Sequence, residues 1–247
     1  MTRAVREPSR VDQDVSFAIF AGSVGAPPTP VFFEITGDPT FASERLLSYE
    51  VGYRRTITKR VYVDFASFYN IHRDLQSYGG LSLLLAATPA PSHLVILLPY
   101  ANGIEGNTLG AEIAPDWQIT PWWQVRGSYS FLHMGLKDAP GYTDTGNVLS
   151  SYEGSSPRHV ANFQSRFHLS KRFELDLDYR YVSALPAQAV TAYQTGGVRL
   201  GWHLGEHLEF SAAGQNLLQP FHAEFGGDPG PLIGIRRSAY AKITWRN

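Results

Sequence analysis

This 247-residue sequence lacks several features that would place it in a common class of protein. It has no cysteine, which excludes a disulfide framework and a thiolate metal site. Charged residues make up 17% of the chain, against roughly 25% in ordinary soluble domains. The formal net charge of -1 shows no basic excess, so we expect no nucleic-acid partner.

Two kinds of segment are missing as well. The most apolar stretch, residues 81–100, is interrupted by Pro89, Pro91 and Pro99, so it predicts an outer loop with some strand extension, not a membrane helix. The opening residues, MTRAVREPSRVDQD, contain no apolar segment of the kind found in signal peptides. Either the protein stays inside the cell, or its natural N-terminus lies outside this sequence.

From about residue 46 onward, apolar and polar side chains alternate with a period of two, which is the pattern of β-strands with one apolar face. In a soluble protein that face packs on a core, whereas in a bilayer it contacts lipid. The final strand shows the pattern, because Ala239, Ala241, Ile243 and Trp245 share one face. About nine such segments cover residues 46–54, 61–70, 108–117, 123–131, 161–169, 174–181, 198–203, 208–215 and 238–246.

The opposite faces of these strands collect the charges, and the centres of the apolar faces carry none. In a membrane barrel such charges line the interior. They are Glu50, Arg54, Asp64, Glu112, Arg126, Arg166, Asp176, Asp178, Arg180, Arg199 and Lys242. Asp176 and Asp178 also suit paired carboxylates for glycoside hydrolysis, but a charge ladder explains them better. The eight histidines show no metal-ligand spacing, so we expect no metal site.

The connections between strands distinguish a membrane barrel from a soluble β-sandwich, which would alternate too. Short connections lie near residues 58–59, 119–121, 170–172 and 205–207. Long connections lie between them, at about residues 71–103, 135–157, 184–194 and 217–235. Strict alternation of short and long is expected of a barrel with tight periplasmic turns and extended outer loops.

Tryptophan supports the membrane interpretation, because all five tryptophans lie near the short-turn end of a strand. They are Trp117, Trp122, Trp123, Trp202 and Trp245. Such a group predicts an aromatic girdle at one membrane interface. Tyr69, Tyr181 and Phe131 lie near the other ends and predict the opposite girdle.

Seven stretches follow one another along the chain: SYEVGYR, VDFASFYNIHRDLQS, ANGIEGNTLGAEI, SSPRHVANFQSR, LDYRYVSALPA, LEFSAAGQNLLQP and RRSAYAKITWRN. In order and spacing they resemble the C-terminal half of the barrel of TonB-dependent outer-membrane receptors. The resemblance runs from about Pro8 to Asn247, and GQNLLQP followed by the terminal strand is its most specific part.

This resemblance implies an all-β fold, an antiparallel meander that is an open portion of a 22-stranded barrel. It implies a receptor in the outer membrane of a Gram-negative bacterium that takes up a scarce chelate, such as a ferric siderophore or cobalamin. The implied partners are outer-membrane lipid, the metal chelate and the TonB complex, the last through a plug and TonB box outside this sequence. The resemblance also implies that the interior charges contact this plug. No enzymatic activity and no cofactor are implied. A passive or structural barrel is the alternative, and a soluble β-rich carbohydrate-active enzyme is a weaker one.

The chain divides into residues 1–45, which are proline-rich without steady alternation and predict an extracellular loop-like segment, and the barrel portion, residues 46–247. Aromatic candidates for ligand binding in the long loops are Tyr142, Tyr152, His222 and Phe225. Residues expected to carry the membrane and assembly signal of the terminal strand are Tyr240, Ile243 and Trp245. The final Asn247 stands where such barrels usually end in an aromatic residue.

Strand direction predicts that the sheet is open. With short turns on one side, the first and ninth strands run the same way, and closing the sheet would pair them in parallel, unlike bacterial barrels. We therefore expect residues 236–246 to pair only with residues 208–216. A ladder from residues 46–56 to the terminal strand would instead indicate a small closed barrel.

Overall fold

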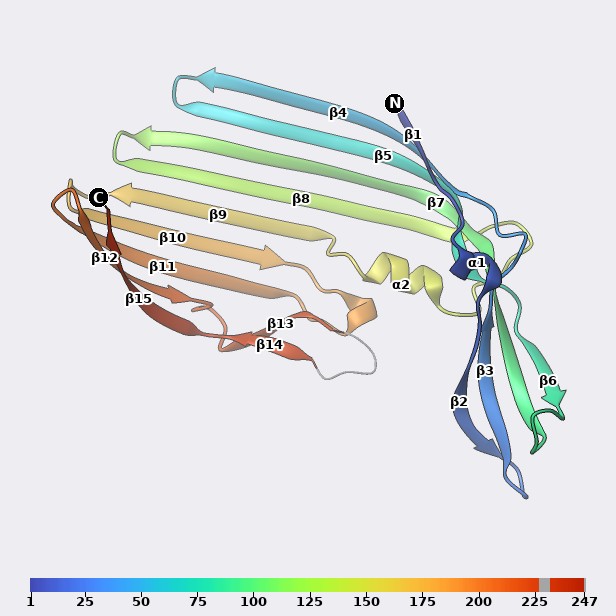
Figure 1. Cartoon of the computed structure of the whole chain (residues 1–247). Helices are drawn as coiled ribbons and strands as arrows, with labels where there is room; N and C mark the ends of the chain where they lie inside the picture. The colour runs from blue at the N-terminus through green and yellow to red at the C-terminus, as the bar shows by residue number, and fades with distance from the viewer. Residues whose placement is uncertain (227–231, 247) are drawn as a thin grey trace. The chain divides into compact units, whose positions relative to one another are not determined.

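The computed structural model describes residues 1–226 and 232–246, and Figure 1 draws them as an almost entirely β structure. The main path of the large sheet contains β1 (Thr2–Arg6), β4 (Glu44–Thr58), β5 (Val61–Tyr78), β7 (His93–Thr120), β8 (Trp123–Asp138), β9 (His159–His168), β10 (Phe173–Val182), β11 (Tyr193–Leu204), β12 (Leu208–Gln215) and β15 (Ser238–Trp245). The other elements are α1 (Arg10–Asp14), β2 (Ser16–Val24), β3 (Thr29–Thr36), β6 (Ser82–Ala86), α2 (Val148–Gly154), a 3-10 turn (Pro186–Gln188), β13 (Phe221–Phe225) and β14 (Ile233–Arg236). Among these elements no helix is long and apolar enough to span a membrane.

The strand order β4-β5-β7-β8-β9-β10-β11-β12-β15 confirms the predicted meander of nine strands. The predicted short turns are confirmed too, because β4 ends at Thr58 and β5 begins at Val61, and the other three short connections are similarly tight. One strand more lies on this path, since β1 pairs with β4 from Thr2↔Ser48 to Arg6↔Glu44.

The sheet is open, as predicted. β15 pairs with β12 from Leu208↔Trp245 to Gln215↔Ser238. Within residues 1–226 and 232–246, no ladder joins β15 to β4 or β1. The outer edge of β15 therefore has no neighbouring strand in the described part of the chain.

The chain folds into two compact units. Unit 1 comprises residues 1–49, 69–108 and 134–153, and unit 2 comprises residues 50–68, 109–133 and 154–247. Unit 1 contains the ends of β4, β5 and β7 that are farther from the short turns, together with β1, α1 and most of α2. Unit 2 contains the strand ends at the short turns together with β9 to β15.

The long connection expected at residues 71–103 is much shorter in the structure, because β5 continues to Tyr78 and β7 begins at His93. In this region polar side chains fall on both faces of β5, so the period-two signal ends before the strand does. Tyr69 and Phe131, predicted to lie near strand ends, are therefore internal to β5 and β8.

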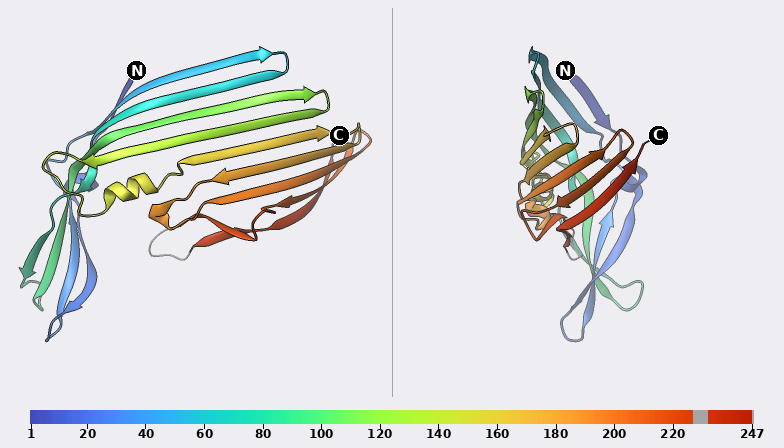
Figure 2. Two further views of the ribbon diagram at one scale, coloured as in Figure 1. Left: turned by 180° about the vertical axis from the view of Figure 1, so that it is seen from behind. Right: turned by 90° about the vertical axis from the view of Figure 1, so that its left-hand side faces the viewer.

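Residues 1–45 also contain more β structure than their sequence indicated. β2 and β3 form a hairpin, and β3 pairs in parallel with the first part of β7, from Val31↔Leu94 to Thr36↔Pro99. β6 completes the group by pairing with β7. We call β2, β3, β6 and residues 93–99 of β7 the arm, and Figure 2 shows these strands side by side in both views. Consecutive apolar residues such as Phe17 to Phe20 hide the alternation of these strands.

The buried core is small, and much of the apolar surface is exposed. Ile104 is fully buried in unit 1, and Val182 and Val190 are buried in unit 2. By contrast Val51 is 66% exposed and Leu177 is 39% exposed on faces predicted to contact lipid. Exposed apolar stripes along strands are what a sheet presents when its solvent on that side is hydrocarbon.

Several aromatic residues of unit 2 contact one another near the short turns. The rings of Trp123 and Phe167 stack with centroids 5.5 Å apart, and those of Phe173 and Trp202 are 6.2 Å apart. Trp123 Nε1 also donates to Ser165 Oγ at 2.8 Å. These contacts occur where β7 and β8, β9 and β10, and β11 and β12 turn, so they support the predicted girdle.

Candidate functional site

Unit 1 holds a polar cluster at the strand ends away from the short turns. It is organised by α1, whose first turn is closed by a capping box between Ser9 and Asp12. Ser9 N donates to Asp12 Oδ2 at 2.7 Å, and Asp12 N donates to Ser9 Oγ at 3.3 Å. This short helix places Asp12, which is almost completely buried, beside the end of β1.

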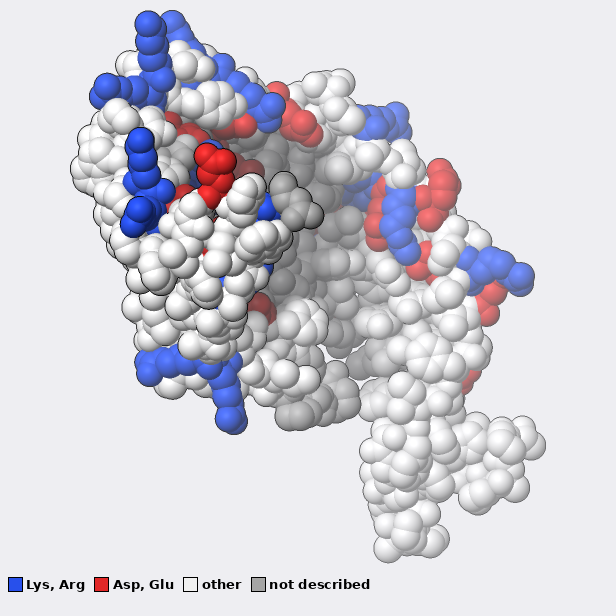
Figure 3. Space-filling model, turned by 60° about the vertical axis from the view of Figure 1, so that its left-hand side comes forward, with Lys and Arg blue, Asp and Glu red and all other residues white. Residues whose placement is uncertain are grey.

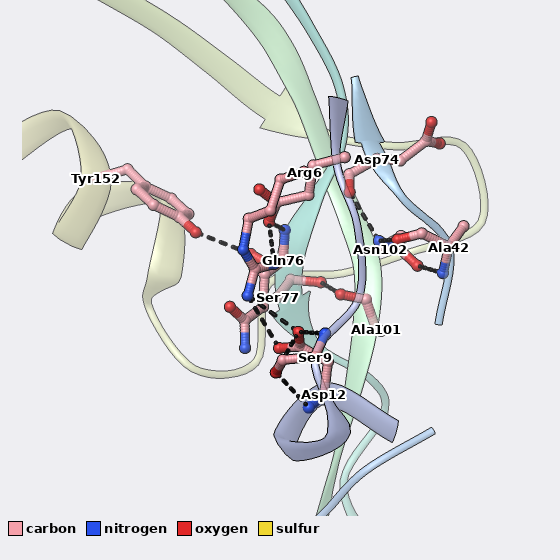
Figure 4. Close-up of polar contacts among 11 residues, drawn as sticks. Arg6, Ser9, Asp12, Ala42, Asp74, Gln76, Ser77, Ala101, Asn102 and Tyr152 are labelled. Atoms are coloured by element: carbon pink, nitrogen blue, oxygen red, sulfur yellow. Dashed lines mark hydrogen bonds and ion pairs between the residues drawn. The ribbon is translucent and has the colours of Figure 1, made fainter. Parts of the chain in front are cut away.

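Arg6 connects this helix to the sheet. Its Nη2 donates to Asp12 Oδ2 at 3.0 Å, and its Nη1 lies 3.3 Å from Glu44 Oε1 on β4. Glu44 Oε1 also accepts from Gln76 N on β5 at 2.9 Å. Figure 4 shows Tyr152 of α2 turned toward this group, and its hydroxyl donates to Gln76 O at 3.4 Å.

The charges of the cluster stabilise one another. Burial raises the pKa of Asp12, but hydrogen bonds from Ser9 and the charge of Arg6 outweigh it, so the pKa lies below its ordinary value. Burial lowers the pKa of Arg6, but the hydrogen bond to Asp12 and the charge of Glu44 outweigh it, so the pKa lies above its ordinary value. Burial, and then the charge of Glu44, raise the pKa of Tyr152.

Asn102 of β7 fixes the neighbouring loop by backbone contacts. Its side chain accepts from Ala42 N at 2.7 Å and donates to Ala42 O at 3.0 Å and to Asp74 O at 2.7 Å. Nearby, Ser77 Oγ accepts from Gly103 N at 2.8 Å. Figure 4 shows the contacts of Asn102 and Ser77 beside Arg6 and Asp12, so the chain segments around the cluster are held at several points.

A pocket of about 360 Å³ opens beside this cluster. Three tyrosines, Tyr78, Tyr100 and Tyr152, supply much of its wall, and the rings of Tyr78 and Tyr100 stack with centroids 5.5 Å apart. Gln76, Ser77 and Ser151 add amide and hydroxyl groups, and among the described residues no Lys, Arg, Asp or Glu lines it. Such a pocket offers aromatic faces and neutral hydrogen-bonding groups to a ligand.

The four aromatic loop candidates do not form one site. Tyr152 lines the pocket, whereas Tyr142 packs beside Gly103, also within unit 1. His222 and Phe225 belong to unit 2. His222 is buried with its ring stacked on Tyr193 at 4.6 Å, and Phe225 is 69% exposed.

Sequence reasoning missed Tyr78 and Tyr100. They flank the apolar stretch at residues 81–98, and β5 and β7 bring the two ends of that stretch together through Gly79 N, which donates to Pro99 O at 2.8 Å. Aromatic residues at both ends of one hairpin would have been the signal to follow.

The charges of unit 2 that were predicted to face the interior lie in register on one face of the sheet. Arg166 lies opposite Asp176, which lies opposite Arg199 on the next strand, so three predicted interior residues form one cross-strand row. Lys242 lies opposite Ser211. Cross-strand partners point to the same side, so the register agrees with the predicted grouping.

Arg199 is the centre of an ion-pair network in this face. Its Nη1 lies 3.0 Å from Asp176 Oδ2 and 3.4 Å from Glu174 Oε2, and its Nη2 pairs with Glu209. Arg246 Nη2 lies 3.1 Å from Glu209 Oε2. A polar pocket of about 340 Å³ adjoins these residues and is also lined by Lys242 and Tyr240.

The remaining interior candidates are distributed along the same strands. Arg54 pairs with Asp64 at 2.7 Å, and Arg126 pairs with Asp116 at 2.7 Å. Asp116 was not among the predicted residues, although its position two residues after Ala114 and four after Glu112 continues their face. The others are Glu50 on β4, Glu112 on β7, and Asp178 and Arg180 on β10.

The terminal strand places its predicted signal residues on two faces. Ile243 lies opposite Phe210 and is 66% exposed, and Trp245 lies opposite Leu208 and is 68% exposed. Tyr240 lies on the other face, lining the polar pocket with Lys242. Of these three residues, only Ile243 and Trp245 therefore continue the stripe predicted to contact lipid.

Residues 2–217 match the family model described as TonB dependent receptor-like, beta-barrel. The chain belongs to this family. Membership confirms the resemblance seen in the seven sequence stretches. This family consists of outer-membrane receptors, and the proteins compared below are described as receptors and transporters, not as enzymes.

Solved receptor structures share the fold of this TonB-dependent receptor barrel. The siderophore receptor PirA from Acinetobacter baumannii is 13% identical to this chain, with a TM-score of 0.65. The match covers 98% of this chain and 38% of the PirA chain. A mutant of the ferric enterobactin receptor from Pseudomonas aeruginosa is 13% identical, with a TM-score of 0.66. The match covers 98% of this chain and 37% of the receptor chain. The copper transporter OprC is 11% identical, with a TM-score of 0.60, and the match covers 98% of this chain and 37% of the OprC chain. No curated protein matches the chain. The chain thus spans a little over a third of the length of these solved proteins.

Proposed function

We propose that the chain is the C-terminal barrel portion of an outer-membrane receptor for TonB-dependent, energy-coupled uptake of a metal chelate, such as a ferric siderophore or cobalamin. The observation that carries this proposal is the open nine-strand meander, which matches 98% of the chain to part of a siderophore receptor. The plug, the TonB box and the other barrel strands would be supplied by sequence outside these residues.

The tyrosine pocket of unit 1 is proposed as part of the ligand-holding surface. Long outer loops positioned by a rigid sheet are where a receptor first contacts its ligand. Tyr78, Tyr100 and Tyr152 offer aromatic faces for the organic part of a chelate, and the polar groups of Gln76, Ser77 and Ser151 offer it neutral hydrogen bonds. Residues 1–45, which supply Arg6 and Asp12 to the neighbouring polar cluster, are accordingly proposed to lie on the extracellular side of the barrel portion, residues 46–247.

The charged face of unit 2 is proposed to line the barrel interior and hold a plug. Many of its charges already pair with neighbouring strands, so a plug would be held by many modest hydrogen bonds and ion pairs. Such contacts are individually weak enough to be released when energy is delivered through TonB. The apolar stripe containing Val51 and Ile243 would contact outer-membrane lipid.

Ligand binding tests the proposal. The purified chain in detergent is titrated with ferric enterobactin, a ferric hydroxamate and cobalamin while its intrinsic fluorescence is recorded. We expect one of them to bind, and Tyr152→Ala to weaken that binding about tenfold by removing an aromatic wall. Tyr142→Ala is the matched control, since Tyr142 is a similarly exposed loop tyrosine that does not line the pocket.

Uptake tests the receptor role itself. Deleting the gene that encodes this chain should abolish energy-dependent accumulation of the radiolabelled metal from the chelate that binds, while leaving diffusion of small solutes unchanged. Unchanged accumulation, together with loss of a passive ion conductance in outer-membrane extracts, would instead support a pore.

A further inference from the structure

The arm of unit 1 is a four-stranded sheet that is almost free of charge. No Lys, Arg, Asp or Glu occurs at residues 15–33 or 79–104, which form most of it. Figure 3 shows its lower end as a white lobe, in contrast to the mixed blue and red surface above. A solvated surface is normally rich in charge, and patches of this kind mark places where another molecule binds.

Apolar side chains continue in register from one strand of the arm to the next. Ile19 lies opposite Phe33, Phe33 opposite Ile96, and Ile96 opposite Leu83. Cross-strand partners point to the same side of a sheet, so these four residues form one apolar row across all four strands. Leu83 at the end of this row is 65% exposed.

The two edges of the arm differ in their protection. The β2 edge is interrupted by a bulge between Phe20 and Gly22, and Gly22 has a φ of 134°. The β6 edge is regular, from Ser82↔Leu97 to Ala86↔His93, and bonds only to β7 within the described residues. Natural edge strands are normally blunted by charge, proline or a bulge, and β6 has none of these.

We propose that the β6 edge is the interface with a second copy of this chain. The two β6 strands pair antiparallel about a two-fold axis at Leu84. In this register Leu84 lies opposite Leu84 of the second copy, Leu83 opposite Leu85, and Ser82 opposite Ala86. Both arms then join into one continuous sheet, and the edge backbone groups of both copies are satisfied together.

The chemistry of β6 favours a second copy over a different strand. A two-fold interface brings each surface against itself, so any charge in it would meet a like charge. The sequence SLLLA carries no charge and pairs its three leucines with leucines, so it is complementary to itself. Leu83, Leu84 and Leu85 are 65%, 49% and 71% exposed, and the pairing would cover part of each.

Disulfide trapping tests this register, because the chain contains no cysteine of its own. Directly paired residues have Cα atoms about 5 Å apart, within the range of a disulfide, whereas residues offset by two positions are about 8 Å apart. In detergent solution, Leu84→Cys alone should give a covalent dimer. Leu83→Cys alone and Leu85→Cys alone should not, but a mixture of the two should. Absence of every cross-link would overturn the proposal, and equal cross-linking by all three single variants would mean unspecific aggregation and overturn it too.

Sedimentation provides an independent measurement. Leu84→Lys should weaken self-association by more than about tenfold, because two lysines would then face each other across the axis. Ile19→Lys is the matched control on the bulged β2 edge, where the residue is similarly exposed, and it should leave the dimer intact. A dimer lost in Ile19→Lys and kept in Leu84→Lys would place the interface on the other edge and refute the assignment to β6.

Discussion

Nη2 of Arg6 lies 3.0 Å from Oδ2 of Asp12, a residue that is 2% exposed. This contact joins β1 to α1, and the same guanidinium reaches Glu44 on β4. The outer end of the first strands is therefore held by a charge pair that also borders the tyrosine pocket. Loss of the pair should affect both stability and the geometry of the proposed ligand surface.

Asp12→Asn should lower the free energy of unfolding of the chain in detergent by about 1–3 kcal/mol, because it removes charged hydrogen bonds to Ser9 and Arg6 from a buried group. Asp14→Asn is the control, since Asp14 belongs to the same helix but is exposed. Equal effects of the two substitutions in a urea titration would show that the buried pair contributes nothing specific.

The same pair predicts a dependence on pH. The pKa of Asp12 is lower in the folded chain than its ordinary value near 4, so its contribution is complete above that value. It is lost as the pH falls through the folded pKa. The stability difference between the wild-type chain and Asp12→Asn should therefore be constant near neutral pH and shrink below about pH 4. A difference that grows on acidification would contradict the lowered pKa.

Arg199→Ala should destabilise the chain by about 2 kcal/mol, because it leaves Asp176 and Glu174 without this cation and Glu209 with Arg246 alone. Lys242→Ala is the matched control. Lys242 lines the same pocket but makes no ion pair within residues 1–226 and 232–246, so its removal should cost no more than about 0.5 kcal/mol. Thermal unfolding of both variants in the same detergent measures the difference.

Much of the sheet could be predicted from sequence, because the side chains on one face of each strand are mostly apolar and those on the other face are mostly polar. Around Val51 and Leu177 apolar and polar residues alternate regularly, and the structure has strands at the predicted positions, β4 and β10. It fails in the arm, where Phe17 to Phe20 are apolar on both faces, and where β3 pairs in parallel with residues about sixty positions away. Local periodicity carries no information about such a partner.

The site was predictable to a smaller degree. Tyr152 could be named as a loop aromatic, but Tyr78 and Tyr100 become its neighbours only because β5 and β7 extend past the end of their alternating pattern. The charges predicted to face the interior share a face by strand periodicity alone, which is readable in the sequence. Which of them pair depends on side-chain reach along the face, since Arg199 bonds to Glu209 although His203 is the residue opposite Glu209.

Gly106→Ala should destabilise unit 1 by about 2–4 kcal/mol. Gly106 has a φ of 153°, and a Cβ there would overlap Gly135 O and lie 2.8 Å from Leu136 Cα, which are backbone atoms of the neighbouring strand. Gly80→Ala is the control, because nothing lies within 4 Å of its Cβ position. Proteolysis and urea unfolding should both separate the two variants. Similar stability of the two variants would mean that β8 does not approach Gly106 of β7 closely enough for a Cβ atom to clash.

The orientation of the sheet in the membrane is the most general prediction. If the apolar stripes contact lipid, arginine at Val51, Phe163 or Leu177 should cost about 2–4 kcal/mol near the bilayer midplane. Arginine at Ser128 or Gln164, on the opposite face of the sheet, should be tolerated. Ser128 lies opposite Asn162 and Gln164 lies opposite Asp178, so both positions have polar partners. Folding titrations into lipid vesicles measure the cost at each position. Equal sensitivity of the two sets would mean that neither face contacts hydrocarbon, and the receptor assignment would then lose its physical basis in this chain.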